Sequence, residues 1–109
     1  MKGAFIIGTA ILTYDEDGKP LSSEFSPAIL KVEPDQLRDA LSHIDKPTGA
    51  EQIRSRAETI MATWFNHVES VELADREDGE ITSRVLECKE WPNGHPQLCA
   101  IEFSWTPRK

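Results

Sequence analysis

The sequence predicts an α+β fold, an antiparallel sheet of about five strands in the order ββααβββ with a layer of two helices on one face. Three observations support this fold class. Residues 48–68 have the apolar spacing of one long amphipathic helix. Alternating apolar segments occur on both sides of that helix, and Gly-containing turns separate them as in hairpins. The chain has 109 residues, so residues 1–109 are predicted to form a single domain around one core.

The first apolar segment, Phe5–Tyr14, has apolar residues on both alternating faces, which is typical of a strand in the interior of a sheet. An acidic turn closed by Gly18 follows it. A second strand is then predicted over Leu21–Val32, where Pro27 indicates an edge position or a bulge. The apolar run at the start is short for a signal peptide and no cleavage site follows it, so a strand and a cytoplasmic location are expected.

Two helices are predicted in the middle of the chain. Pro34–Asp45 has the spacing of a short amphipathic helix that begins at a proline. Thr48–Val68 is the long helix, and Thr48 followed by Glu51 predicts a capping box at its start. Polar residues such as Arg54 are expected to face water. The stripe predicted to face the core comprises Ile53, Ala57, Ile60, Met61, Trp64 and Val68.

The last third of the chain predicts three strands. The first two, at about Val71–Ala74 and Ile81–Trp91, flank an acidic turn. Asn93-Gly94 is the residue pair favoured in a two-residue type I′ hairpin loop before the last strand, which ends in a polar tail.

The two-residue loop places Cys88 opposite Cys99, on the face that Leu86, Ile101 and Phe103 share. Counting from the loop makes them a hydrogen-bonded pair, whose side chains stand farther apart than those of a non-hydrogen-bonded pair, so a disulfide is less natural there. Free thiols that behave as small core residues are therefore expected. Neither cysteine lies in a CxxC motif or at ligand spacing from a histidine, so no zinc site is predicted.

Motifs of catalysis are missing from the sequence. It has no nucleophile elbow, Gly-rich phosphate loop, HExxH motif or paired carboxylates. The turn at Asp15–Gly18 does not match an EF-hand loop, because Thr13 would stand at the first ligand position. No cofactor and no metal are expected, and the protein is predicted not to be an enzyme.

Charge is the most informative feature of the sequence. The formal net charge is −7, which repels nucleic-acid phosphates and attracts a basic protein. Residues 69–80 hold a net charge of −5, with Arg76 as the one base. This segment is predicted to bind the partner, with Trp91 as an aromatic anchor. Solvated acids and local packing of Trp91 are the simpler explanations. The predicted partner-binding residues are Glu69, Glu72, Asp75, Glu77, Asp78, Glu80 and Trp91.

The predicted function is that of a small acidic binding protein that occludes a basic protein, such as a nucleic-acid-binding protein or a nuclease. Immunity proteins, antitoxin-like proteins and phage-encoded inhibitors form this class, and mimicry of nucleic-acid charge is one way to block such a partner. Direct contact with nucleic acid is not expected. Membrane insertion is not expected either, since no apolar run approaches the roughly twenty residues that a span needs.

Two alternatives stay open at this point. One is a small-ligand module or an enzyme with a pocket between the helices and the sheet, built from dispersed residues such as Tyr14, Arg54, Arg56 and His67. The other is a structural homodimer, in which a second copy covers one face of the first strand.

Overall fold

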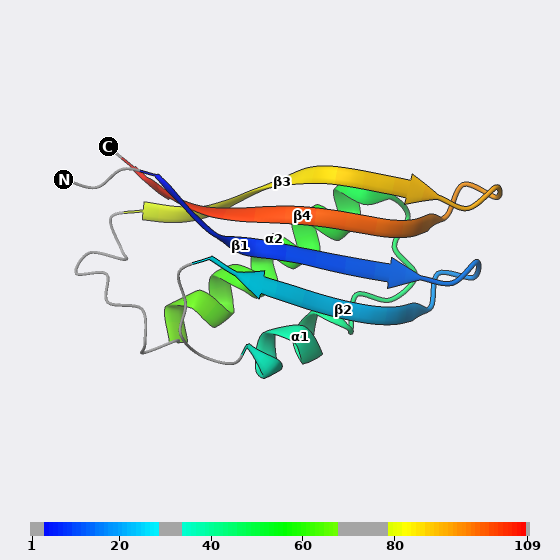
Figure 1. Cartoon of the computed structure of the whole chain (residues 1–109), viewed down its shortest axis with the longest axis horizontal. Helices are drawn as coiled ribbons and strands as arrows, with labels where there is room; N and C mark the ends of the chain where they lie inside the picture. The colour runs from blue at the N-terminus through cyan, green and yellow to red at the C-terminus, as the bar shows by residue number, and fades with distance from the viewer. Residues whose placement is uncertain (1–3, 29–33, 68–78, 109) are drawn as a thin grey trace.

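The computed structural model describes residues 4–28, 34–67 and 79–108. Four strands form one antiparallel sheet in the spatial order β2-β1-β4-β3, so β1 and β4 are central. Both helices lie on the same face of that sheet, with α1 next to β2 and α2 against β3 and β4 (Figure 1). The α+β class is therefore confirmed.

The strands are β1 (Phe5–Tyr14), β2 (Pro20–Pro27), β3 (Gly79–Glu90) and β4 (Pro96–Pro107), and the helices are α1 (Asp35–Leu41) and α2 (Ala50–His67). The order within the described residues is ββααββ, with four strands where the sequence predicts about five. The predicted strand at Val71–Ala74 lies outside the described residues. β2 is an edge strand that ends at Pro27, as the missing N–H of proline favours.

The core lies between the two helices and the inner face of the sheet. Successive strand residues point to opposite faces, so every second residue of β4 from Cys99 to Trp105 is buried. On the outer face of β1, Ile6 and Ile11 are 46% and 37% exposed. This is the face that a second copy would cover in the homodimer alternative, which stays a prediction. The buried core residues are Ile7, Ala10, Leu12, Tyr14, Phe25, Leu37, Leu41, Ile44, Ile53, Ala57, Met61, Phe65, Cys99, Ile101, Phe103 and Trp105.

The buried stripe of α2 differs from the predicted one. Its buried members recur every four residues and are Ile53, Ala57, Met61 and Phe65. Ile60 and Trp64 are only partly buried, and Trp64 meets Phe25 edge to face with 6.3 Å between the ring centroids. The prediction that Trp64 belongs to the buried stripe is therefore wrong, because Phe65 takes its place. Val68, the last predicted member, lies outside the described residues.

The capping box predicted at the start of α2 is also wrong. The Gly49 carbonyl accepts the first helical hydrogen bond, so Gly49 holds the cap position instead of Thr48. The side chain that reaches back belongs to Gln52, whose Oε1 accepts from the Thr48 backbone N–H at 2.7 Å. Glu51 is unable to do so because Arg54 binds its carboxylate at 2.6 Å.

Both hairpins turn through three residues, 16–18 and 92–94. In each, the backbone N–H before the loop donates to the carbonyl after it. The last loop residue is a glycine in the left-handed region, Gly18 with φ 85° and Gly94 with φ 89°. A type I turn followed by a left-handed residue has this geometry. The two-residue type I′ loop predicted at Asn93-Gly94 is therefore wrong.

Cys88 nevertheless stands opposite Cys99, as predicted. The longer loop shifts the register by one residue, and an irregularity near the end of β3 shifts it back. Both cysteines are free, Cys99 buried and Cys88 partly exposed, and burial raises the pKa of the Cys99 thiol to about 12. Leu86 does not share their face. It lies at a bulge and is 46% exposed, while Val85 stands opposite Ile101.

Candidate partner-binding site

The two described members of the predicted partner-binding set lie at opposite ends of β3. Glu80 is exposed at the start of that strand, whereas Trp91 directly follows its last residue, Glu90. At about 3.3 Å per residue, the length of β3 separates them by roughly 35 Å. They do not share one surface. The other five members, Glu69, Glu72, Asp75, Glu77 and Asp78, lie outside the described residues.

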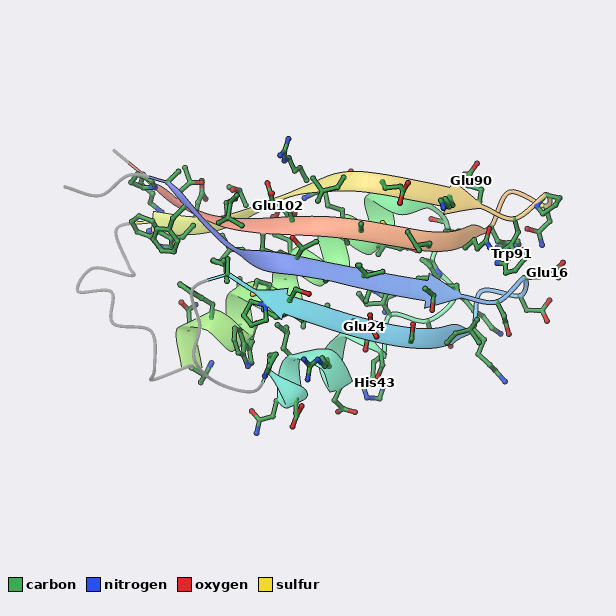
Figure 2. The ribbon with its side chains drawn as sticks, viewed as in Figure 1. Glu16, Glu24, His43, Glu90, Trp91 and Glu102 are labelled. Carbon is green, nitrogen blue, oxygen red and sulfur yellow. The ribbon has the colours of Figure 1, made fainter. Side chains whose placement is uncertain are left out.

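Trp91 belongs to the end of the molecule where both hairpins turn. Its indole N–H donates to the Tyr14 carbonyl at 3.0 Å, and the Asn93 side-chain amide donates to the Glu16 carbonyl at 2.9 Å. These bonds hold the two loops side by side (Figure 2). Trp91 is partly buried there, so local packing accounts for its position.

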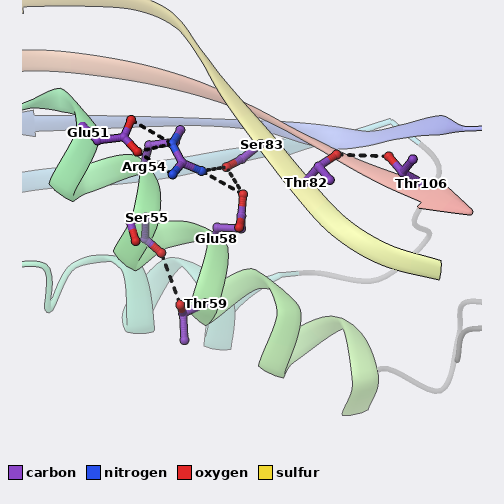
Figure 3. A network of polar contacts seen from close by, with 8 residues as sticks. All are labelled: Glu51, Arg54, Ser55, Glu58, Thr59, Thr82, Ser83 and Thr106. Carbon is purple, nitrogen blue, oxygen red and sulfur yellow. Dashed lines mark hydrogen bonds and ion pairs between the residues drawn. The ribbon is translucent and has the colours of Figure 1, made fainter. Parts of the chain in front are cut away.

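Arg54 ties α2 to β3 (Figure 3). Its Nη1 donates to Glu58 Oε2 and to Ser83 Oγ, both at 2.9 Å, and the Ser83 hydroxyl donates to Glu58 at 2.6 Å. The hydrogen bond from Arg54 lowers the pKa of the Glu51 carboxyl. Because the Arg54 side chain is only 23% exposed, the expectation that it faces water is wrong. These bonds join the helical layer to the edge of the sheet.

Of the remaining residues proposed for a ligand pocket, Tyr14 is buried, and Arg56 and His67 have local partners. Burial raises the pKa of the Tyr14 phenol well above its ordinary range. Arg56 donates to the Asp45 carbonyl at 3.4 Å. The ring Nδ1 of His67 lies 2.7 Å from the Thr63 carbonyl in the last turn of α2.

A cavity of about 600 Å³ opens at the other end of the molecule, where α2 and β4 end and β3 begins. Its floor is apolar, because the aromatic side chains of Phe65 and Trp105 form it. Both side chains are buried. Its rim is polar and exposed. The described lining residues are Ala62, Phe65 and Asn66 of α2, Gly79, Glu80 and Ile81 of β3, and Trp105 and Arg108 at the end of β4. None of the four residues predicted to build a pocket is among them.

Gly79 has a steric role in the wall of this cavity. A Cβ at this position would lie 2.2 Å from Cε2 and Cζ2 of Trp105, a distance that no side chain tolerates. The indole also stacks on Phe5, with 5.4 Å between the ring centroids. Its buried N–H has no hydrogen-bond partner in the structure described here, and such a group typically costs about 1–3 kcal/mol.

The charges at the cavity have both signs. Glu80, the last residue of the acidic segment, contributes a carboxylate. Arg108 contributes a guanidinium that already interacts within the chain. The Asn66 side chain adds an amide, which both donates and accepts hydrogen bonds. Within the described ranges, no group of three or more His, Cys, Asp or Glu residues is placed to hold a metal ion.

Of the cavity residues, only Glu80 is among the predicted partner-binding residues. Gly79 is a second signal that could have indicated the site, because a glycine in a strand often marks a close approach of other atoms. Asn66, Trp105 and Arg108 carry no such sign, because their neighbours in the cavity are distant in the chain. Comparison of the chain with protein-family models, with curated proteins and with solved structures gives no match.

Proposed function

We propose that this protein is a non-enzymatic binding protein whose acidic segment, residues 69–80, attracts and occludes a basic protein. The observation that carries the proposal is the concentration of charge, since this segment holds −5 of the net −7. Clustered charges of one sign raise the rate at which an oppositely charged partner is captured. The position of Glu80 adds support, because an exposed acid of the segment lies on the rim of a cavity with an apolar floor.

The composition of the segment supports the same proposal. Residues 69–80 hold six acids and one base, Arg76. A cluster with this excess of one sign attracts an opposite charge over about one Debye length, about 10 Å at 0.1 M salt. The excess favours the acidic segment as the surface that a partner meets first.

The proposed partner is a nucleic-acid-binding protein or a nuclease, because the basic surface that binds phosphates also complements a cluster of carboxylates. Occlusion of that surface by mimicry of nucleic-acid charge would make this chain an inhibitor of the immunity, antitoxin-like or phage-encoded class. Among the helices that the structure describes, none is long and apolar enough to cross a membrane.

The test neutralises the segment and measures binding kinetics with a purified partner. The variant carries Glu72→Gln, Asp75→Asn, Glu77→Gln and Asp78→Asn. We expect a slower association rate and a flatter dependence of that rate on salt, because screening acts on long-range attraction. Circular dichroism should show the same fold as in the parent.

A matched control removes four acids from other surfaces, with Asp17→Asn, Glu24→Gln, Glu87→Gln and Glu90→Gln. All four residues are exposed, and the change in net charge is the same. The control should slow association less than the segment variant does. Equal effects of the two variants would show that net charge alone matters, and unchanged kinetics in both would reduce the segment to a solubilising element.

A small-ligand protein is the second candidate function, and the cavity is the observation that favours it. Its volume of about 600 Å³ lies in the range of small-molecule pockets, about 300–1,000 Å³. Its lining comes from α2, β3 and the end of β4. A ligand that raises the melting temperature and perturbs the nuclear magnetic resonance (NMR) signals of the cavity residues would establish this function.

A further inference from the structure

We infer that the cavity at the start of β3 binds a cationic side chain, lysine or arginine, that the basic protein partner presents. This inference rests on the proposed function for the source of the ligand. The chemistry of the cavity supports it separately, through the shape of the lining and the placement of the polar groups.

The lining suits a side chain with a long apolar stem and a charged head. Phe65 and Trp105 form an apolar floor, and Ala62 and Ile81 are partly exposed beside it. Lysine and arginine bury their methylene stems along such surfaces while the charged group stays near water. A volume of about 600 Å³ leaves room for the stem, the head and bound water.

Acceptors for the charged head stand at the rim. Glu80 is exposed and offers a carboxylate, and the Asn66 side chain offers a carbonyl oxygen. Both ammonium and guanidinium groups are donors without acceptors, so these two oxygens match what the ligand lacks. A neutral apolar ligand would offer no donor to either group.

The sign of the charge also favours a cation. Glu80 is the acid among the described lining residues, and it belongs to a segment whose net charge is −5. Arg108 also lies on the rim with the opposite charge, and it already interacts within the chain. It therefore weakens the attraction for a cation, and its removal should strengthen binding.

The test uses two small probes, with a glutamate counterpart as a negative control, and the full chain labelled with ¹⁵N. The first probe is Nα-acetyl-arginine N-methylamide, and the second is the citrulline counterpart, which has nearly the same shape but no charge. The chain has three tryptophans, so Trp64→Phe and Trp91→Phe variants assign the indole signal of Trp105. We expect the arginine probe to shift that signal and the Asn66 side-chain amide signal saturably, in the millimolar range.

Charge discrimination is the decisive readout. Citrulline should bind about two- to fivefold more weakly than arginine, as expected for one exposed ion pair. Glu80→Gln should remove this difference, and Arg108→Gln should increase the affinity for arginine by a similar factor. Equal binding of the two probes, or stronger binding of Nα-acetyl-glutamate N-methylamide, would overturn the inference.

A blocking variant and its control locate the binding. Ala62→Leu adds bulk inside the cavity, and Thr63→Leu adds an exposed leucine on the next residue of α2, outside the lining. The first should abolish the shifts and the second should preserve them. Shifts that survive in Ala62→Leu would place the probe elsewhere and refute the inference.

The outcomes separate this inference from the proposed function. If the probes fail while neutralisation of residues 72–78 slows partner association, the partner uses the acidic segment alone and the cavity inference is wrong. If the arginine probe binds as expected while that neutralisation leaves association unchanged, the cavity inference stands and the proposed function loses its support.

Discussion

Two adjacent residues of α2 provide a sharp test of how the helix faces the sheet. Phe65 is 1% exposed, whereas Trp64 is partly buried and has an edge-to-face contact with Phe25. Truncation of a fully buried aromatic to alanine typically costs about 3–5 kcal/mol. We therefore expect Phe65→Ala to lose that amount and Trp64→Ala to lose about half of it, in spite of the larger side chain removed.

The measurement is urea unfolding followed by far-ultraviolet circular dichroism, which does not depend on tryptophan fluorescence. A domain has about 5–15 kcal/mol of stability in total, so Phe65→Ala should lose a large share of it. One kcal/mol lowers the melting temperature of a small domain by about 4 °C or more, so thermal unfolding of Phe65→Ala should show a decrease of more than about 12 °C. Both variants place alanine at neighbouring helical positions, which matches the helix propensity of the new residue. A larger loss in Trp64→Ala than in Phe65→Ala would refute the assigned stripe.

Three other predictions follow from local contacts. Gly79→Ala should cost about 1–3 kcal/mol, measured by urea unfolding, because the new Cβ would lie 2.2 Å from the indole behind it. Cys99, whose pKa burial raises to about 12, should resist alkylation in the native protein at about pH 8, and mass measurement should find two labels after denaturation without reductant. Arg54 lowers the pKa of Glu51. The ion pair therefore contributes to stability above the ordinary pKa of about 4.3, and this contribution is lost as pH falls through the lowered pKa. The Glu51→Gln variant lacks the contribution, so its free energy of unfolding in urea should decrease less on acidification than that of the parent.

Elements with strong periodicity were predictable from the sequence. The predicted bounds of β1, Phe5–Tyr14, are those of the structure, and α2 lies within the predicted Thr48–Val68. The orientation of α2 was not predictable in the same way. Trp64 and Phe65 are both apolar and adjacent in sequence, so two stripes one residue apart fit the helical period equally well. Contacts with the sheet decide between them.

The second hairpin loop contained a usable sequence sign. Asn93-Gly94 suits a type I′ loop, but it also suits a type I turn whose following glycine is left-handed. Pro92 favours the latter, because proline presets the backbone for the second position of a type I turn. The cysteine register was correct for the wrong reason, since an irregularity in the β3–β4 ladder compensates for the extra loop residue.

The cavity could not be predicted from the sequence, for a topological reason. Its described lining comes from residues 62–66, 79–81 and 105–108, three parts of the chain that only the fold brings together. Antiparallel pairing of β3 with β4 puts the start of one strand beside the end of the other, and α2 ends over the same place. A sequence pattern within one helix or strand does not indicate which residues of other elements will lie beside it.

The distribution of satisfied polar groups favours the cavity end of the molecule for recognition. At the hairpin end, Trp91 and Asn93 donate to backbone carbonyls of the other hairpin, and the Lys46 N–H donates to the Gly18 carbonyl at 2.9 Å. These bonds, each worth about 0.5–1.5 kcal/mol net, already occupy those polar groups, so the groups are not available to a partner. At the cavity end, the side chains of Glu80 and Asn66 are exposed on the rim and accessible to a ligand. A ligand that binds at the cavity need not break the bonds that hold the two hairpins together.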